Sequence, residues 1–486
     1  MPRRGYGCGQ RRVGGRDAVV LCLTVAFGLG LHLSIYANDR PRHREHAFPE
    51  PFRPRAPREA PAPAAFEGPS LYASLVETER AIVEQTLSVE RAVVAEVVEE
   101  ARSIVGAPAA GAGPMEAWAA ARLFPVVLLA CDRESLLRDA LTSLVAGCGA
   151  EPEDILVVRD GDDAAVERVV REFRGVRFAS RARNPRKVLD GAARIAGHYE
   201  FALKKAMEAF ADAPAVVVAE DDLVFSPDFL AYFSAVGPIV ERDASVFVVS
   251  AWNDNGFADA DAADPAALRR SAWFPGLGWL LPRALWETEL RDRWPSTHWD
   301  HWMREPRNHR GRECVYPEIP RSFHAGSKGT FMDPWHDARY FRRIVHRTAP
   351  YRWPRRAYAP VMTDAYELRI RKQLASAEHV GDLAALKARA AAADDARPLA
   401  LWYHWPPAQK FRDNPPPFLC LSEVLGIWHE HQRAAHSGLH EHHLGRRKVF
   451  LINVRESDDY RTFKPVGLAP LTQDGCPRLS WKDIGK

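Results

Sequence analysis

Short apolar runs alternate with helix-forming segments from Phe124 onwards, and this alternation limits the possible folds more than any other feature of the chain. The runs predict buried strands at Val126–Ala130, Ile155–Val158, Val176–Ala179 and Val216–Ala219. Helical spacing of apolar residues is found between them, at Glu134–Val145, Asp163–Phe173 and Ala192–Phe210. Strands and helices in alternation indicate an α/β domain with a mainly parallel sheet.

Charged side chains stand at the carboxyl ends of three of these strands. Arg133 follows the first strand, Asp160 the second, and the triplet Glu220–Asp222 the fourth. Ligands of such sheets bind at this edge. Three successive carboxylates repel one another unless a cation or a set of donors neutralises them, so we expect a magnesium or manganese site here. An acidic triplet alone also fits a solvated surface loop.

The composition excludes several other classes of protein. The 66 Lys and Arg residues nearly balance the 63 Asp and Glu residues, for a net charge of +3, which argues against a nucleic-acid-binding protein. The seven cysteines lack the spacing of a zinc site. No P-loop or GxGxxG motif is present, so a bound nucleotide must be held without a glycine-rich loop.

The N-terminal region predicts a membrane anchor. Residues 18–37 carry no charge and are long enough to cross a bilayer as a helix. Arginines precede this run and a polar stretch follows it, which keeps residues 1–17 cytoplasmic and the rest of the chain lumenal. A cleaved signal peptide is the alternative, but the run is long for one and no small-x-small cleavage site clearly follows.

A stem is predicted over residues 38–122. Pro41–Pro63 is rich in proline and arginine and favours an extended spacer. Leu71–Val105 repeats apolar residues at near-heptad intervals between charged ones. Both a self-associating helical stalk and a solvated single helix fit this pattern.

Four ordered motifs resemble glycosyltransferase family 13. They are Val217–Leu223 (VVAEDDL), Ser250–Gly256 (SAWNDNG), Phe274–Trp279 (FPGLGW) and Trp299–Arg304 (WDHWMR), and the match continues through Arg310–Cys314 and Pro317–Ile319. The resemblance implies a GT-A type nucleotide-sugar-binding domain over residues 123–350. It also implies UDP-GlcNAc as donor, Mn2+ as cofactor with Mg2+ or Co2+ as possible substitutes, and inverting transfer of GlcNAc to the 2-hydroxyl of a mannose.

The resemblance also assigns roles to individual residues. Asp222 is expected to be the metal ligand. Donor contacts are expected from five residues, namely Arg133, Asp160, His198, Glu220 and Asp221. Arg133 could instead simply begin a helix, and His198 could be an ordinary helix histidine.

Asp300 is the expected catalytic base, because the family register places the catalytic aspartate at this position. The flanking Trp299 and Trp302 would exclude water and raise its basicity. Without the resemblance, an ion pair with Arg304 one helical turn away is an equally good explanation of Asp300. His301 is a rival base.

Two positions depart from the family. Val248 stands where the family has a cysteine that pairs with the equivalent of Cys314, so that disulfide is not expected. Phe331 stands where the N-glycan enzyme of the family has a donor-binding serine, which places one donor contact in doubt.

Residues 351–486 are expected to form a smaller α+β region of the same catalytic unit. Leu425–Trp428 and the apolar run Val449–Val454 look more like the O-mannose enzyme of the family than the N-glycan enzyme. We expect the dense histidines of this region to be solvent-exposed rather than metal-bound, because their spacing fits no ligand frame. They are His429, His431, His436, His440, His442 and His443.

These expectations describe a single-pass type II Golgi membrane enzyme with a lumenal catalytic region. Its predicted partners are UDP-GlcNAc and a mannose-terminated glycoprotein, with no nucleic acid. The first hypothesis for the acceptor is the α-1,3-mannosyl arm of an N-glycan, and the alternative is mannose linked to Ser or Thr. A lumenal glycan-binding protein without catalysis and a transferase of another sugar class are the remaining hypotheses.

Overall fold

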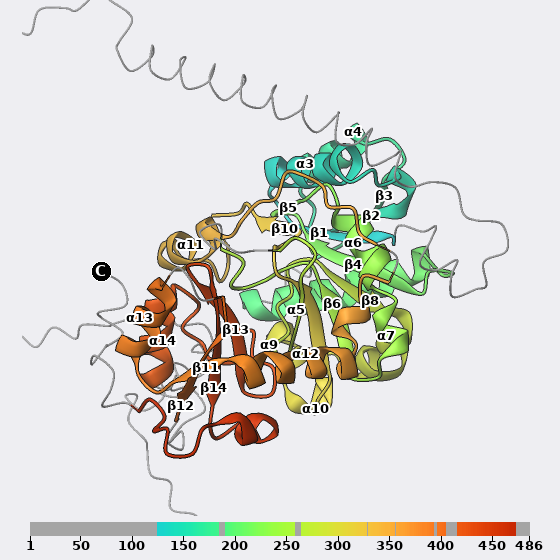
Figure 1. The fold of residues 1–486 in the computed structure, drawn as a ribbon. Coiled ribbons are helices and arrows are strands. Elements are labelled where there is room, and N and C mark those ends of the chain that lie inside the picture. The colour runs from blue at the N-terminus through green and yellow to red at the C-terminus, as the bar shows by residue number, and fades with distance from the viewer. Residues whose placement is uncertain are drawn as a thin grey trace, which may run out of the picture. The chain divides into compact units, whose positions relative to one another are not determined.

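The computed structural model describes residues 124–183, 190–257, 264–327, 329–354, 356–392, 396–404 and 416–472 (Figure 1). All of these fall within one compact unit of the chain, Leu87–Lys486. The predicted tail, anchor and stem (residues 1–17, 18–37 and 38–122) lie outside the described residues and stay predictions. Within the described ranges, no helix combines the length and apolar character required to cross a membrane.

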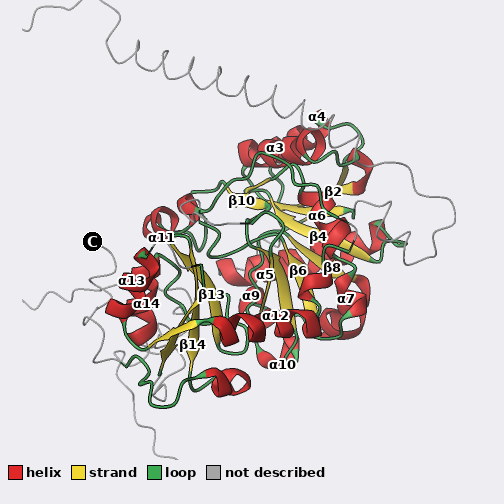
Figure 2. Ribbon diagram, viewed as in Figure 1, coloured by secondary structure: helices red, strands yellow, loops and turns green. Residues whose placement is uncertain are grey.

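An eight-stranded mixed sheet forms the centre of the fold, with the order β3-β2-β1-β4-β8-β6-β9-β7 (Figure 2). Its strands are β1 Val126–Ala130, β2 Ile155–Asp160, β3 Arg177–Arg181, β4 Ala215–Glu220, β6 Val246–Ser250, β7 Leu268–Ser271, β8 Trp279–Pro282 and β9 Glu313–Pro317. The first four strands pair in parallel, as the sequence predicts. By contrast, β8 runs antiparallel to β4 and β6, and β7 runs antiparallel to β9.

The helices α3, α4 and α5 connect the parallel strands β1 to β4 at the predicted places. The helices are α3 Glu134–Thr142, α4 Ala164–Glu172, α5 Gly191–Ala209, α6 Phe229–Val236, α7 Ile239–Arg242, α8 Arg283–Leu285, α9 Trp299–Met303, α10 Pro306–His309, α11 Pro334–Arg339, α12 Thr363–Ser376, α13 Leu383–Ala391 and α14 Pro416–Leu425. Asp163 begins α4 and Asp190 begins α5, because each side chain accepts hydrogen bonds from first-turn amides.

The hydrophobic core lies on both faces of the sheet. Alternate residues of β1 belong to two different clusters: Leu128 packs with residues of α3, α4 and α6, and Leu129 packs with residues of α5. Strands buried on both faces have apolar residues at consecutive positions, which is why β1, β2 and β4 contain continuous apolar runs. The prediction of a buried strand at Val176–Ala179 is wrong in one respect, because β3 is the edge strand of the sheet and stays partly exposed.

A second sheet follows in the C-terminal part, with the order β11-β12-β14-β13. Its strands are β11 Glu378–Val380, β12 Leu399–Tyr403, β13 Leu439–Leu444 and β14 Arg447–Asn453. Glu441 on β13 joins this sheet to the central one, because it forms ion pairs with Arg269 of β7, Arg369 of α12 and Lys448 of β14. The smaller α+β region is therefore present, and its predicted boundary at residue 351 stays a prediction.

The prediction that the C-terminal histidines are solvent-exposed is wrong. His429, His431, His436, His440 and His442 are buried, and His443 is partly buried. The reason is tertiary packing around β13. His440 packs against Phe418 of α14, with ring centroids 5.0 Å apart. His436 lies between two carboxylates, those of Glu313 and Glu367.

Candidate active site

The acidic triplet lies at the carboxyl end of β4 and leads into the short strand β5, Leu223–Phe225. Donors surround it. Arg133, directly before α3, donates from Nη1 to Oδ2 of Asp222 over 2.6 Å, and its Nη2 pairs with Asp221. The backbone amide of Cys131 also donates to Asp221, over 3.3 Å. Parallel pairing of β1 and β4 brings these groups together.

Burial and neighbouring charges shift the pKa values of the three carboxylates in different directions. Burial and the nearby Asp222 raise the pKa of Asp221 to about 7, although Arg133 opposes the shift. Burial also raises the pKa of Glu220, with Asp222 adding to it. Burial acts in the same direction on Asp222, but hydrogen bonding from His324 and the charge of Arg133 outweigh it and hold the pKa of Asp222 below its usual value. Asp222 is therefore the carboxylate of the triplet best suited to stay ionised.

His324 is a site residue that the sequence analysis missed. It ends β10, Ser322–His324, which pairs antiparallel with β5 so that His324 is opposite Leu223. This pairing places Nε2 of His324 3.3 Å from Oδ2 of Asp222. Gly326 keeps the adjacent space open, because a Cβ at that position would lie 3.0 Å from Oδ2 of Asp222. Only strand pairing joins His324 to the triplet, so no local motif could have indicated it.

Asp160 is the last residue of β2, and His198 of α5 lies beside the same strand. Asp160 accepts from Arg181 over 2.8 Å and from Arg183 over 3.0 Å. His198 on α5 is buried, and its Nε2 lies 2.8 Å from the carbonyl oxygen of Val158. Burial lowers the pKa of His198 to about 4, so the ring is neutral and donates to that carbonyl.

Cys131 connects this group to the triplet. Its amide binds Asp221, and its Sγ accepts from Arg183 over 2.7 Å. The side chain of Arg183 in turn binds Asp160. The expected donor-binding residues therefore form two adjoining groups along one edge of the sheet.

Tyr199 links the triplet to Asp300. Its hydroxyl donates to Oε1 of Glu220 over 2.7 Å, and its ring stacks on Trp299 at a centroid distance of 3.9 Å. Trp299 is the first residue of α9, and Asp300 follows it. Burial raises the pKa of Tyr199 well above its usual value, and the charges of Glu220, Asp222 and Asp300 add to the shift. Tyr199 was also absent from the residues expected from the sequence.

Asp300 forms an ion pair with Arg304, over 2.7 Å from Nη1 to Oδ2. This is the pair that the sequence offered as an explanation of Asp300 other than catalysis. The expectation that its surroundings raise its basicity is wrong for this structure. Burial acts in that direction, but the charges of Arg304 and His301 outweigh it, so the pKa of Asp300 is lowered. Its side chain is 30% exposed, which leaves it accessible to a ligand.

Stacked cations and rings form the wall beside Asp300. The guanidinium of Arg304 lies 4.2 Å from the ring centroid of Trp273, and that of Arg433 lies 4.8 Å from the same ring. Arg433 also lies 4.0 Å from the ring of Trp428. Such contacts contribute about 0.5–2 kcal/mol each and orient the cations. The segment after α14 thus contributes to the surroundings of Asp300.

The two departures from the family occupy distinct places. Val248 and Cys314 are direct partners in the parallel pairing of β6 and β9, and Cys314 is a free, buried thiol. Phe331 is 41% exposed, and its ring centroid lies 6.2 Å from that of His298, two residues before Asp300. Phe331 therefore lies in the neighbourhood of Asp300.

The residues present fit a divalent cation at Asp222. Oδ1 of Asp222 is buried and has no hydrogen-bond partner among the described residues. The 3.3 Å between Oδ2 of Asp222 and Nε2 of His324 is close to the ~3 Å that separates adjacent ligands of an octahedral ion with bonds of about 2.1 Å. In the described ranges, no group of three or more His, Cys, Asp or Glu side chains could hold a metal alone. Substrate phosphates would have to complete the coordination.

Comparison with known proteins gives one family match. The model of the GNT-I family matches residues 70–393. An Arabidopsis thaliana protein named alpha-1,3-mannosyl-glycoprotein 2-beta-N-acetylglucosaminyltransferase is 33% identical over 216 residues, which cover 43% of this chain and 48% of that protein. The chain thus matches about half the length of this curated relative.

Two solved structures are similar over parts of the chain. TarS 1-349 from S. aureus, in complex with UDP-GlcNAc, is 11% identical with a TM-score of 0.31, over 42% of this chain and 59% of that one. The mannosyltransferase PcManGT from Pyrobaculum calidifontis, in complex with GDP-Man and Mn2+, is 17% identical with a TM-score of 0.29, over 65% and 87%. At these TM-scores neither structure bears on the chemistry of this chain.

Proposed function

Because the chain belongs to the GNT-I family, we propose that it is an inverting glycosyltransferase that moves N-acetylglucosamine from UDP-GlcNAc to the 2-hydroxyl of a mannose. The observation that carries the proposal is the convergence of Asp222, Tyr199 and Asp300 at one sheet edge. A group able to bind a metal and a separate carboxylate on the acceptor side are the two components that such a transfer requires.

The donor would lie along the edge that carries the two donor-binding groups. Asp222 and His324 would hold a divalent cation, which neutralises charge on the departing pyrophosphate when bound. An imidazole beside a carboxylate favours manganese or cobalt over magnesium, which prefers oxygen ligands alone. Arg133 now neutralises Asp221 and Asp222, and it is positioned to bind a diphosphate instead.

On the acceptor side, Asp300 takes the proton from the attacking 2-hydroxyl. The oxygen of that hydroxyl forms a bond to the anomeric carbon as the bond from this carbon to UDP breaks, which inverts the configuration. Arg304 holds the Asp300 carboxylate ionised, so the base is in its reactive state at neutral pH. The rings of Trp299 and Tyr199 limit access of water from one side.

The proposed acceptor is the mannose of the α-1,3 arm of an N-glycan, which the name of the Arabidopsis relative supports. The full-length protein in detergent, with UDP-GlcNAc and Mn2+, should transfer GlcNAc to a mannose-terminated N-glycan. An O-mannosyl peptide and donors UDP-Gal and GDP-mannose serve as comparisons. No transfer to either mannose acceptor would refute the proposed activity, and a preference for the O-mannosyl peptide would refute the proposed acceptor.

We also propose that residues 18–37 anchor the protein in the Golgi membrane, with residues after 37 lumenal. The uncharged run and its arginine flank support this orientation. Protease added to intact Golgi vesicles should leave the catalytic region undigested until detergent is added. Digestion in intact vesicles would contradict the orientation.

A further inference from the structure

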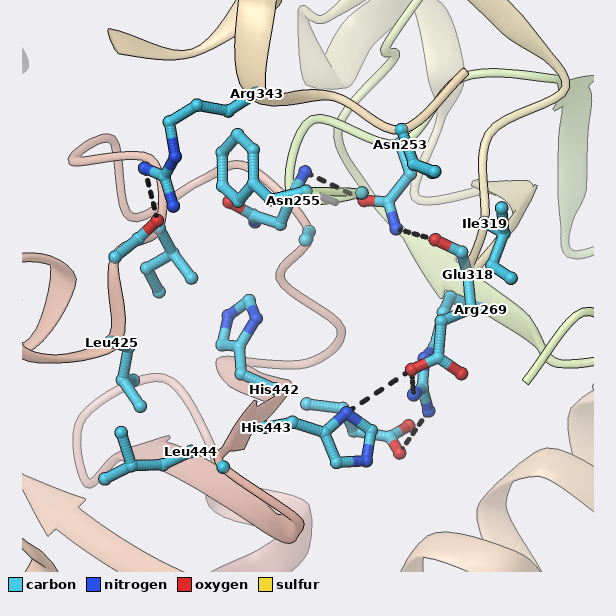
Figure 3. A pocket seen from close by; sticks show the side chains of 18 of the residues that line it. Asn253, Asn255, Arg269, Glu318, Ile319, Arg343, Leu425, His442, His443 and Leu444 are labelled. Carbon is cyan, nitrogen blue, oxygen red and sulfur yellow. Dashed lines mark hydrogen bonds and ion pairs between the residues drawn. The ribbon is translucent and has the colours of Figure 1, made fainter. Parts of the chain in front are cut away.

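A cavity of about 330 Å³ lies between the end of the central sheet formed by β9 and β7 and the C-terminal hairpin of β13 and β14 (Figure 3). It is separate from the Asp222 group, because its wall contains none of the donor-binding residues, Asp222 or Asp300. The volume is at the lower end of the range of about 300–1,000 Å³ found for small-molecule pockets. It therefore suits a ligand of one or two rings.

His442 points into this cavity, and its ring stacks on that of His440 at a centroid distance of 5.9 Å. The residue is 7% exposed, and its Nε2 has no hydrogen-bond partner within the part of the chain that the structure describes. Figure 3 shows the ring directed toward the middle of the cavity. An unsatisfied buried polar atom costs about 1–3 kcal/mol, so a ligand that supplied a hydrogen bond here would gain from it.

The carboxylates in the wall are already paired, and the wall residue Arg343 donates to the carbonyl oxygen of Gly426 over 3.1 Å. Glu318 binds Arg269 over 2.9 Å, Glu441 binds Arg369 and Lys448, and Glu423 binds Arg339. A metal ion needs an excess of negative charge, which these pairs remove. Burial holds the pKa of His442 well below its usual value, so its ring adds no charge.

What remains in the wall suits a neutral, hydroxyl-rich molecule. Paired carboxylates and guanidinium groups still have free acceptor and donor positions for hydroxyls. The cavity is also lined by Phe257, Tyr316 and Leu444, which can contact the C–H faces of a sugar ring. We propose that this cavity binds a neutral saccharide unit, as a second carbohydrate site apart from the transfer site.

The location of the cavity relative to Asp300 indicates which molecule would supply the saccharide unit. Asp254, between the wall residues Asn253 and Asn255, binds Arg433 over 2.8 Å. Arg433 in turn stacks on Trp273, on which Arg304 also stacks. A glycan reaching from Asp300 past this wall would bring another of its sugars to the cavity. This link to the acceptor rests on the proposed function, whereas saccharide binding itself does not.

Ligand-observed NMR with the full-length protein tests the proposal without any transfer reaction. The probes are methyl α-mannoside, methyl β-N-acetylglucosaminide and a branched mannose oligosaccharide, and the variants are Leu444→Trp, which fills the cavity, and His442→Phe, which removes the hydrogen bond. We expect at least one probe to lose binding about tenfold or more in both variants, which is about 1.4 kcal/mol. The same probe should bind Asp300→Asn as it binds the wild type.

This experiment distinguishes two sources of the sugar, a larger glycan and a single free sugar. Loss for the oligosaccharide alone assigns the cavity to a unit of a larger glycan, and loss for a methyl glycoside assigns it to a single sugar. His379→Gln, on β11, is the matched control and should bind like the wild type. Unchanged UDP-GlcNAc affinity shows that the variants are folded. If neither variant weakens any probe, or if no probe binds the wild type, the proposal is overturned, whether or not the protein transfers GlcNAc.

Discussion

Arg304 donates from Nη1 to Oδ2 of Asp300 over 2.7 Å. Asp300 lies on α9, and Arg304 directly follows this helix, one turn further along the chain. The pair has two consequences. It keeps the carboxylate ionised, and it leaves the carboxylate within reach of a hydroxyl, since the side chain is 30% exposed. The ion pair with Arg304 and a catalytic role of Asp300 are therefore compatible.

Replacement of the proposed base, Asp300, should abolish most turnover without loss of donor binding. Asp300→Asn is expected to lower kcat by about 10²–10⁴-fold, the usual contribution of general base catalysis, while the Kd for UDP-GlcNAc changes little. Turnover kinetics and calorimetry measure the two quantities. His301→Gln is the control, and a larger loss in that variant than in Asp300→Asn would reassign the base.

The pH profile should respond to Arg304. Because Arg304 is the strongest of the groups that lower the pKa of Asp300, Arg304→Met should raise that pKa. The acid limb of kcat/KM, which reports the free base, then moves to higher pH. A limb that stays at the same pH in Arg304→Met would show that Asp300 is not the titrating group.

Metal binding should depend on both Asp222 and His324. With UDP present, Asp222→Asn and His324→Gln should each weaken Mn2+ binding at least about tenfold, a loss found even for residues that only orient metal ligands. Electron paramagnetic resonance of free Mn2+ measures this without turnover. His379→Gln is the control, and wild-type affinity in His324→Gln would remove that residue from the coordination.

His436 should make stability depend on pH above neutrality. Burial opposes its charge, but hydrogen bonds to Glu313 and Glu367 prevail and raise the pKa of His436 to about 9. Against an unfolded value near 6.5, this stabilisation is fully present below about pH 6.5 and is lost as the pH rises through about 9. It amounts to something on the order of 3 kcal/mol.

Denaturant unfolding of the wild type and His436→Gln at several pH values measures this effect. The free energy of unfolding of the wild type should fall between pH 6.5 and 9, and that of His436→Gln should fall less. His379→Gln should follow the wild type, because burial lowers the pKa of His379 and leaves it neutral throughout this range. Parallel curves for wild type and His436→Gln would contradict the assignment.

A disulfide should form if the family's missing cysteine is restored. Val248 and Cys314 are partners on adjacent strands and belong to the same cluster of the core, and both are fully buried. After oxidation, Val248→Cys should lose both thiols at these positions, as peptide mapping by mass spectrometry shows. Persistence of both thiols would mean that β6 and β9 are paired in another register.

The sequence alone determined the elements whose signal is local. Residues of β1, β2 and β4 are apolar at consecutive positions because both faces of each strand are buried, and Asp163 and Asp190 mark helix starts through their own side chains. The charged residues at the strand ends were likewise visible, since parallel strands bring their carboxyl ends to one edge.

Only the tertiary structure decided what lies opposite these residues. His324 reaches Asp222 through pairing of β10 with β5, and Arg433 reaches Trp273 from the C-terminal part of the chain, over sequence separations that no local pattern encodes. The same holds for the pKa of Asp300 and for the buried histidines. A histidine is exposed or buried according to what packs on it, and for His440 that is a helix formed by residues about twenty positions earlier.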